Sequence, residues 1–306
     1  MAFIDFTCIK KMSFLFLVLF FICNLSNAQD LEPRAYANMP TGGNVIVASY
    51  GFMKGDVVSE ATLPIKDFII SSNNFGVGYM HTFGLANKLA RVQVVIPFVL
   101  MDGHATVNEE RIVGNRTGFG DMRIRLGINL LGSPALGIKE FQAYQQKTIF
   151  GVSLVTSVPT GVYYSDKRIN IGTNRWGFKP EIGVSKRFKH VYAEVYSGVW
   201  FYTQNNAYLG NNILKQDPVL SFQGHASYYF KNQMWVGVNL NWFSGGKTEV
   251  DDLPAGSVIN SSRVGATWSM PLTRSQSIKL QFNTGVFRDL GLNYDSIALS
   301  YQYVFF

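Results

Sequence analysis

The chain has 306 residues, of which 14% are aromatic and only 15% are charged, and its formal net charge is +7. The charged share is far below the roughly 25% of ordinary soluble domains, which disfavours a cytosolic globular protein. The mild basic excess forms no cluster with interleaved aromatic residues, so the sequence does not indicate nucleic-acid binding.

The first 28 residues have the three parts of a secretory signal peptide. Lys10-Lys11 is a basic start, Phe14–Cys23 an apolar core, and Ser26-Asn27-Ala28 a small-residue cleavage site before Gln29. The core is much shorter than the roughly 20 apolar residues of a transmembrane helix. We therefore expect export with cleavage of this peptide, with Met12 as an alternative start.

Both cysteines, Cys8 and Cys23, lie inside this peptide. The mature protein would have no disulfide, no thiol chemistry and no cysteine metal site. Cleavage also removes Lys10, Lys11 and Asp5, which lowers the net charge to +6. The rest contains no linker, charge run or low-complexity block, so we expect one domain over residues 44–306, preceded by an irregular segment, residues 29–43.

From residue 44 onward, apolar and polar residues alternate in one segment after another. The clearest is Asp121–Leu130, where Met122, Ile124, Leu126, Ile128 and Leu130 alternate with polar residues or glycine. On a helix these side chains would spread around the axis, whereas on a strand they share one face. We predict twelve strands, at about 44–53, 67–83, 90–98, 121–130, 147–159, 174–188, 190–203, 218–231, 233–244, 259–270, 277–287 and 292–306.

So many apolar strand faces exceed what one soluble core needs, and they suit a closed barrel in lipid. Connections alternate between long and short, as in outer-membrane barrels with long extracellular loops and short periplasmic turns. The fold class predicted is therefore all-β, a transmembrane antiparallel up-and-down barrel of outer-membrane type. A soluble secreted β-sandwich is the alternative. Aromatic residues near strand ends fit interfacial girdles; they are Phe188, Tyr202, Tyr228, Phe230 and Trp242.

Two of the predicted connections are unusually long. Residues 102–118 are predicted to be a long extracellular loop, and residues 132–146 are long where a short turn is expected, with room for a helical turn. The last strand ends in Phe306 and resembles the C-terminal assembly signal of Gram-negative outer-membrane barrels, although Phe306 lies out of register with Ile297, Leu299, Tyr301, Tyr303 and Phe305. The partners expected are membrane lipid, lipopolysaccharide and the barrel-assembly machinery, for a monomer.

Several stretches resemble one bacterial family. They are Leu31–Tyr36, Gly118–Asp121, Leu130–Ala135, Asn170–Glu181 and Gly245–Thr248. The family is the outer-membrane group of phenol-degradation (meta-pathway) proteins, also called transporters, and the resemblance covers the whole mature chain. It implies a barrel that passes small, often aromatic, compounds.

The candidate catalytic pattern is His225 and Ser227 with Asn239 fourteen residues after the histidine. It resembles the spacing in outer-membrane phospholipase A, and His225 should lie opposite Asn239 across a hairpin. All three side chains are predicted to face the lumen, however, where no acyl chain arrives. The other histidines lack metal-ligand spacing, so we expect no catalytic residue, no metal and no cofactor.

The predicted lumen is rich in charge. Strand parity points seven basic side chains inward against three acids, together with polar Gln93, His225 and Asn239; the basic ones are Arg91, Arg123, Arg125, Lys179, Arg187, Arg263 and Lys279, and the acids Asp121, Glu181 and Glu194. We expect Glu181 and Glu194 to lie diagonally across a hairpin and to neutralise Lys179 and Arg187, which leaves Arg91, Arg123, Arg125, Arg263 and Lys279 uncompensated.

The function predicted is a narrow channel for small organic, often aromatic, solutes, with a preference for anions because the lumen is net positive. Residues 29–43 could fold inward and cover the periplasmic mouth as a plug. Two alternatives remain: a structural or surface barrel that transports nothing, and a phospholipase-like enzyme.

Overall fold

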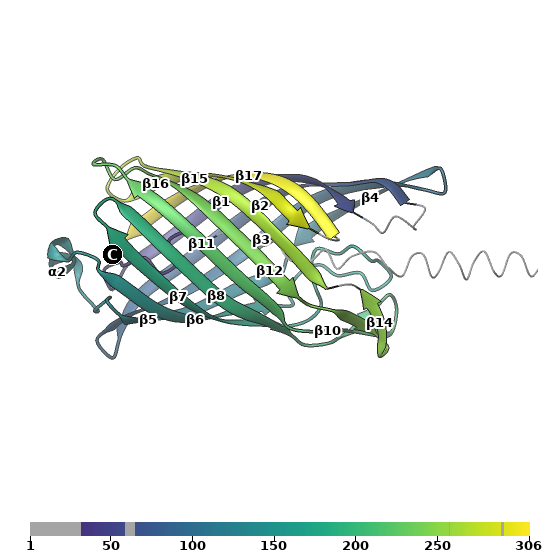
Figure 1. The fold of residues 1–306 in the computed structure, drawn as a ribbon, viewed down its shortest axis with the longest axis horizontal. Coiled ribbons are helices and arrows are strands. Elements are labelled where there is room, and N and C mark those ends of the chain that lie inside the picture. Colours follow the sequence, from purple (N-terminus) through teal and green to yellow (C-terminus); the bar gives the residue numbers. More distant parts are fainter. Residues whose placement is uncertain (1–31, 59–64, 257, 289–290) are drawn as a thin grey trace, which may run out of the picture.

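A closed antiparallel barrel is the main feature of the computed structural model, which describes residues 32–58, 65–256, 258–288 and 291–306. Twelve of its strands form the wall (Figure 1). They are β1 (Asn44–Val58), β2 (Ile65–Leu85), β3 (Lys88–Val107), β5 (Met122–Leu131), β6 (Thr148–Val158), β7 (Gly177–Phe188), β8 (Val191–Tyr202), β11 (Val219–Tyr229), β12 (Trp235–Gly245), β15 (Ile259–Pro271), β16 (Gln276–Arg288) and β17 (Gly291–Phe305). The predicted signal peptide lies outside the described residues.

The first and last strands close the barrel. β1 pairs with β17 from Asn44↔Phe305 to Val58↔Gly291, and its other edge pairs with β2. Each of the twelve strands therefore has a neighbour on both sides. Such closure satisfies the backbone N–H and C=O groups within the wall, which is a condition for strands to cross hydrocarbon.

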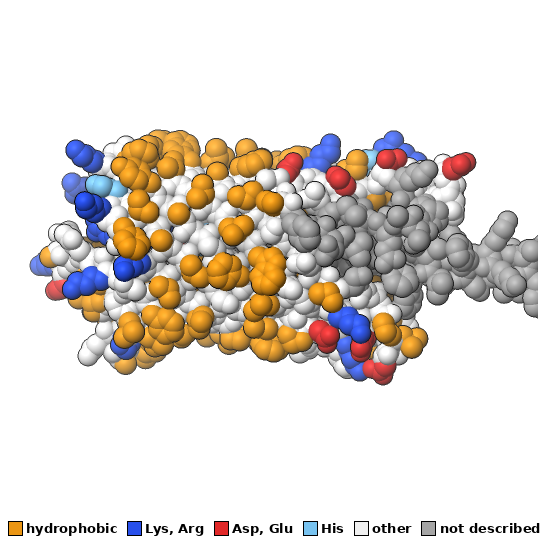
Figure 2. Space-filling model, viewed as in Figure 1, with side chains coloured by type: hydrophobic (Ala, Val, Ile, Leu, Met, Phe, Trp, Pro, Cys, Tyr) orange, Lys and Arg blue, Asp and Glu red, His pale blue; other side chains and the backbone are white. Residues whose placement is uncertain are grey.

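Alternation divides the wall into two faces. On β12 the outward side chains of Val236, Val238 and Leu240 are exposed, whereas the inward side chains of Asn239 and Asn241 are buried. Figure 2 shows apolar side chains spread over the wall and charged ones gathered at the two ends. Among the described residues, no helix is long and apolar enough to cross a membrane.

The predicted strands are confirmed and the 132–146 connection is helical in part as expected, but the 102–118 connection differs from the prediction. Residues 102–118 are not a loop: β3 continues to Val107, and β4 (Glu110–Phe119) returns beside it. The turn between them is Asn108-Glu109, both with positive φ, which is typical of a tight hairpin. The 132–146 connection contains the short helix α2 (Ile138–Ala143).

Four short strands form a second sheet that the alternation did not predict. They are β9 (Asn205–Tyr208), β10 (Asn212–Gln216), β13 (Thr248–Val250) and β14 (Leu253–Gly256). They belong to long connections and lie at the end opposite α2 (Figure 1). We call the end with the long connections the outer end, and the end with α2 and the short turns the inner end.

Candidate functional site in the barrel lumen

The described part of the N-terminal segment, residues 32–43, enters the lumen from the inner end. Its last residues join the wall through the backbone, where Gly42 N donates to Thr82 O (2.7 Å) and Thr82 N donates to Gly43 O (2.9 Å). Thr41 N donates to Leu136 O in the connection that carries α2 (2.8 Å). The segment then runs along the inside of the barrel.

Arg34 attaches the segment to β8. Its backbone N–H donates to Glu194 Oε2 (2.8 Å) and its guanidinium Nη1 donates to Glu194 Oε1 (3.1 Å). The Glu194 side chain is fully buried, and the guanidinium lies 4.0 Å from the centre of the Tyr192 ring. A buried carboxylate with a charged partner and a backbone donor is well satisfied, and undocking Arg34 would leave an uncompensated buried charge, so this contact anchors the segment.

Tyr36 is the second anchor. Its hydroxyl lies 3.0 Å from Ser153 Oγ and donates to Glu181 Oε1 (3.2 Å). Its ring is buried beside that of Tyr196, with ring centres 5.0 Å apart. Burial, followed by the charge of Glu181, raises the pKa of Tyr36, so the hydroxyl stays protonated and can donate.

Arg91 and Asn129 bind the backbone of the same segment. Arg91 donates from its two Nη atoms to the carbonyl oxygens of Ala35 (2.6 Å) and Ala37 (2.9 Å), and Asn129 donates to Tyr36 O (3.4 Å). These bonds satisfy carbonyl groups that have no strand partner, which an irregular segment needs in order to lie inside a barrel.

The tip of the segment joins a charged network. Glu32 Oε2 lies 2.6 Å from Arg125, which also lies 3.3 Å from Glu181, and Glu181 lies 2.8 Å from Lys179. The prediction that Arg125 is uncompensated is therefore wrong, because it did not include Glu32. The segment brings one acid and one cation, so it leaves the cation excess of the lumen unchanged.

The expected neutralisation of Arg187 by Glu194 is also wrong. Glu194 pairs in register with Ser185, whereas Glu181 pairs with Gly198, so the two acids are separated along the hairpin and are not diagonal neighbours. Glu194 binds Arg34 instead. Arg187 donates to the carbonyl oxygen of Lys189 at the turn (2.8 Å).

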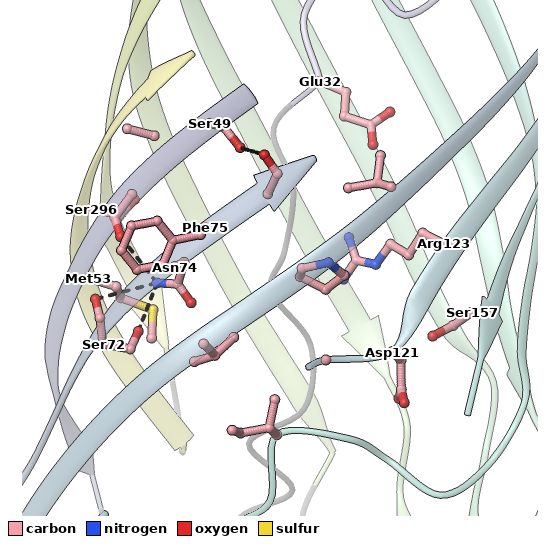
Figure 3. Close-up of a pocket in the computed structure, with 18 of the residues that line it drawn as sticks. Glu32, Ser49, Met53, Ser72, Asn74, Phe75, Asp121, Arg123, Ser157 and Ser296 are labelled. Carbon is pink, nitrogen blue, oxygen red and sulfur yellow. Dashed lines mark hydrogen bonds between the residues drawn. The ribbon is translucent and has the colours of Figure 1, made fainter. Parts of the chain in front are cut away.

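Beyond the tip, a cavity of about 450 Å³ opens toward the outer end. Figure 3 shows Glu32 and Arg123 directed toward it, with Asp121 on the same side of the barrel. Asp121 has a structural role, because its carboxylate accepts bonds from Gly161 N (2.9 Å) and from Thr173 N (2.8 Å). It thereby holds the 159–176 connection inward across the cavity.

Asp121 directly precedes β5, and the other predicted lumen residues occupy inward positions of the strands. The buried ones are Arg91, Asp121, Arg125, Lys179, Glu181, Glu194, His225, Asn239 and Arg263, and the partly accessible ones Gln93, Arg123, Arg187 and Lys279. Arg263 lies 3.4 Å from the centre of the Tyr294 ring and donates to Tyr294 O (3.0 Å). The described residues contain no metal-binding group of three or more His, Cys, Asp or Glu side chains.

The candidate catalytic group is only partly assembled. His225 pairs with Asn239 in register, and their side chains are 2.8 Å apart, as predicted. Ser227, however, has no hydrogen-bond partner for its buried hydroxyl among the described residues. A nucleophile needs an adjacent base, so the three side chains do not form an activated serine here.

The lumen also contains aromatic side chains, which the pattern of charged residues did not predict. Tyr196 and Trp200 are buried on the inward face of β8, and Tyr202 lines the cavity, so its assignment to an outer girdle is wrong. The inward position of Glu194 was sufficient to predict this, since residues two apart on a strand share a face. Trp200 packs with Val155, Val219 and Phe243 in a small apolar cluster inside the barrel.

A model of the family described as "Putative MetA-pathway of phenol degradation" matches residues 54–286. Among solved structures, the chain resembles the COG4313 outer membrane channel from Pseudomonas putida F1, with 18% identity, a TM-score of 0.76 and coverage of 90% of this chain and 100% of that one. It also resembles the transport unit of the autotransporter AIDA-I from Escherichia coli, with 10% identity, a TM-score of 0.53 and coverage of 96% and 98%.

No curated protein matches the sequence significantly. The structural likenesses are distant in sequence and concern the fold, whose relatives are outer-membrane barrels. The family match covers most of the strands, from β1 into β16. The chain is an outer-membrane β-barrel and belongs to the family of the phenol-degradation MetA pathway.

Proposed function

We propose that this protein is an outer-membrane channel for small organic solutes and that it favours anions, aromatic carboxylates among them. The observation that carries the proposal is the charge of the lumen. Arg91 and Arg263 donate to carbonyl oxygens, and neither has a carboxylate partner among the described residues. Lumen charge in a low-dielectric wall is weakly screened and acts on passing ions.

The N-terminal segment would narrow the inner half of the lumen and act as a fixed constriction. This role is supported by the several contacts that hold the segment in place, above all Arg34 with Glu194 and Tyr36 with Glu181. An open inner mouth would require all of these bonds to break together. Solutes would therefore have to pass beside the segment.

Family membership and the fold favour a channel over the two alternatives. A structural or surface barrel would need no accessible path, whereas the lumen here contains a cavity lined by polar and apolar side chains together, as a small organic solute would require. A phospholipase would need an activated serine at the lipid face, and Ser227 points inward. Export by a cleaved signal peptide, assembly through β17 and a monomeric state complete the proposal.

Solute uptake into proteoliposomes tests the proposed channel function and its anion preference. Benzoate and phenyltrimethylammonium, two aromatic ions of opposite charge and similar size, should enter at different rates, with benzoate faster. Liposomes with heat-denatured protein are the control. Equal leakage with and without folded protein would contradict a channel, and faster entry of the cation would contradict the anion preference. The mass of the purified protein reports whether the signal peptide is cleaved.

A further inference from the structure

The hydrogen bonds and ion pairs of residues 32–43, the described part of the N-terminal segment, gather on one side of the barrel. Its side-chain partners come from β3, β5, β6, β7, β8 and β11, and its backbone joins β2. On this side the inward side chains are almost completely covered: Ser185 is 0% exposed, and Ser221 and Ser227 are each 1% exposed. The apolar cluster around Trp200 fills more of the same side.

The opposite side of the lumen stays accessible. The inward residues of β16, β17 and most of β1 are half-buried along the length of the strands, although their outward neighbours face lipid. Their exposure therefore comes from the lumen. They form four registered rows from the inner to the outer end: Ser277–Gln302–Val47, Lys279–Ser300–Ser49, Gln281–Ala298–Gly51 and Asn283–Ser296–Met53.

These rows have a distinct composition. Nearly all of their side chains are small or uncharged, and Lys279 is the one charged side chain in them. Its ammonium group lies 5.9 Å from the centre of the Trp235 ring. Glu32, at the tip of the N-terminal segment, is the carboxylate that acts on it electrostatically, and the two form no direct ion pair. Small side chains leave room for a solute, and an ammonium group without a direct ion pair can bind a carboxylate that passes it.

We propose that solutes cross the barrel along β16, β17 and β1, beside the N-terminal segment, and that Lys279 determines the charge preference of this path. The inference rests on the proposed channel function and gives it a location. The outer rows line the cavity beyond Glu32, through Gln281, Asn283, Ser296 and Ala298. The path continues from there past Lys279 to Ser277 and Gln302 at the inner end. The solute class is small aromatic carboxylates.

Cysteine labelling tests the location. In a background with Cys8→Ser and Cys23→Ser, single cysteines at Ser277 and Ser300 should react with a water-soluble methanethiosulfonate at least about tenfold faster than cysteines at Ser185 and Ser221. All four replace inward serines, so they are matched controls. Labelling in urea shows that each thiol is intact, and gel mobility before and after boiling shows that each variant is folded. Equal rates, or faster labelling at Ser185 and Ser221, would overturn the path.

The mass shift on labelling does not depend on conductance. A protein that conducts nothing yet labels at Ser277 and Ser300 would therefore refute the channel function while leaving the position of the water-filled side intact.

Charge reversal tests Lys279. Lys279→Glu should lower the ratio of anion to cation permeability by about threefold or more, and Lys279→Gln should lower it less. Lys139→Glu on α2 is the control, because it makes the same charge change at an exposed position outside the lumen. A permeability ratio that stays the same in folded Lys279→Glu protein, or that changes equally in both variants, would overturn the role of Lys279.

Discussion

The ring of Tyr36 lies against the backbone of Gly183, so closely that a Cβ atom at Gly183 would come 2.2 Å from the Tyr36 ring. Gly183 pairs directly with Gly151 on β6, where a Cβ atom would come 2.5 Å from the same ring. Two facing glycines, Gly183 and Gly151, thus form the flat surface on which the Tyr36 ring docks. Because neither residue has a Cβ atom, the wall leaves enough space for the ring.

Gly183→Ala should displace this anchor. The added methyl group cannot coexist with the ring, and loss of a buried aromatic contact costs about 3–5 kcal/mol of docking free energy. We expect a larger single-channel conductance and faster proteolysis within residues 32–43. Gly224→Ala is the matched control, because a Cβ atom there meets no atom within 4 Å. Unchanged conductance and proteolysis in Gly183→Ala would contradict a docked segment.

Glu181→Gln should weaken the charged network and strengthen the anion preference. The substitution leaves Lys179 and Arg125 with less compensation in a buried site, which we expect to lower the stability of the barrel by about 3 kcal/mol. The midpoint of urea unfolding in detergent measures this effect. Asp166→Asn is the control: its pair with Lys167 is exposed to solvent, so the unfolding midpoint should stay nearly unchanged. Equal effects would count against the network.

Much of the barrel could be predicted from the sequence because strand alternation is a local signal. Residues such as Met122 and Arg123 reveal their faces without any knowledge of their neighbours. The pairing of the lumen charges could not be predicted in this way. Glu32 and Arg34 belong to a segment without periodicity, and their partners Arg125 and Glu194 are far away in the chain.

The β3–β4 hairpin and the second sheet at the outer end could not be predicted for a related reason. The polar turn at Asn108-Glu109 suits a solvated loop as well as a hairpin, so composition alone does not predict the strands beside it. The strands of the second sheet, such as β13 with three residues, are too short to show alternation.

Asp121→Ala should loosen the connection that lies across the cavity. The substitution removes the buried carboxylate that accepts hydrogen bonds from Gly161 N and Thr173 N. Hydrogen bonds to a charged group contribute about 1.5–3 kcal/mol each. We expect stronger current fluctuations in a planar bilayer while the barrel stays folded. Asp252→Ala is the control, because its pair with Lys215 lies in the exposed outer sheet. Current traces of equal noise in the two variants would contradict this role for Asp121.

Ser227→Ala should leave any lipase assay unchanged. The hydroxyl is buried on the inward face and is not bonded to His225, whose Nδ1 lies 2.8 Å from Asn239 Oδ1. Hydrolysis of a short-chain phospholipid in mixed micelles is the measurement. A hydrolytic activity that is present in the unmodified protein and lost in Ser227→Ala would support the enzyme instead.

The reversal potential of the unmodified protein in a planar bilayer under a salt gradient tests the central claim most directly. The excess of cations over acids in the lumen predicts a conducting pore whose reversal potential has the sign of anion selectivity. The preference should weaken at high salt, because ions screen the lumen charges. A reversal potential of the opposite sign, or a folded protein that gives no conductance, would contradict the account.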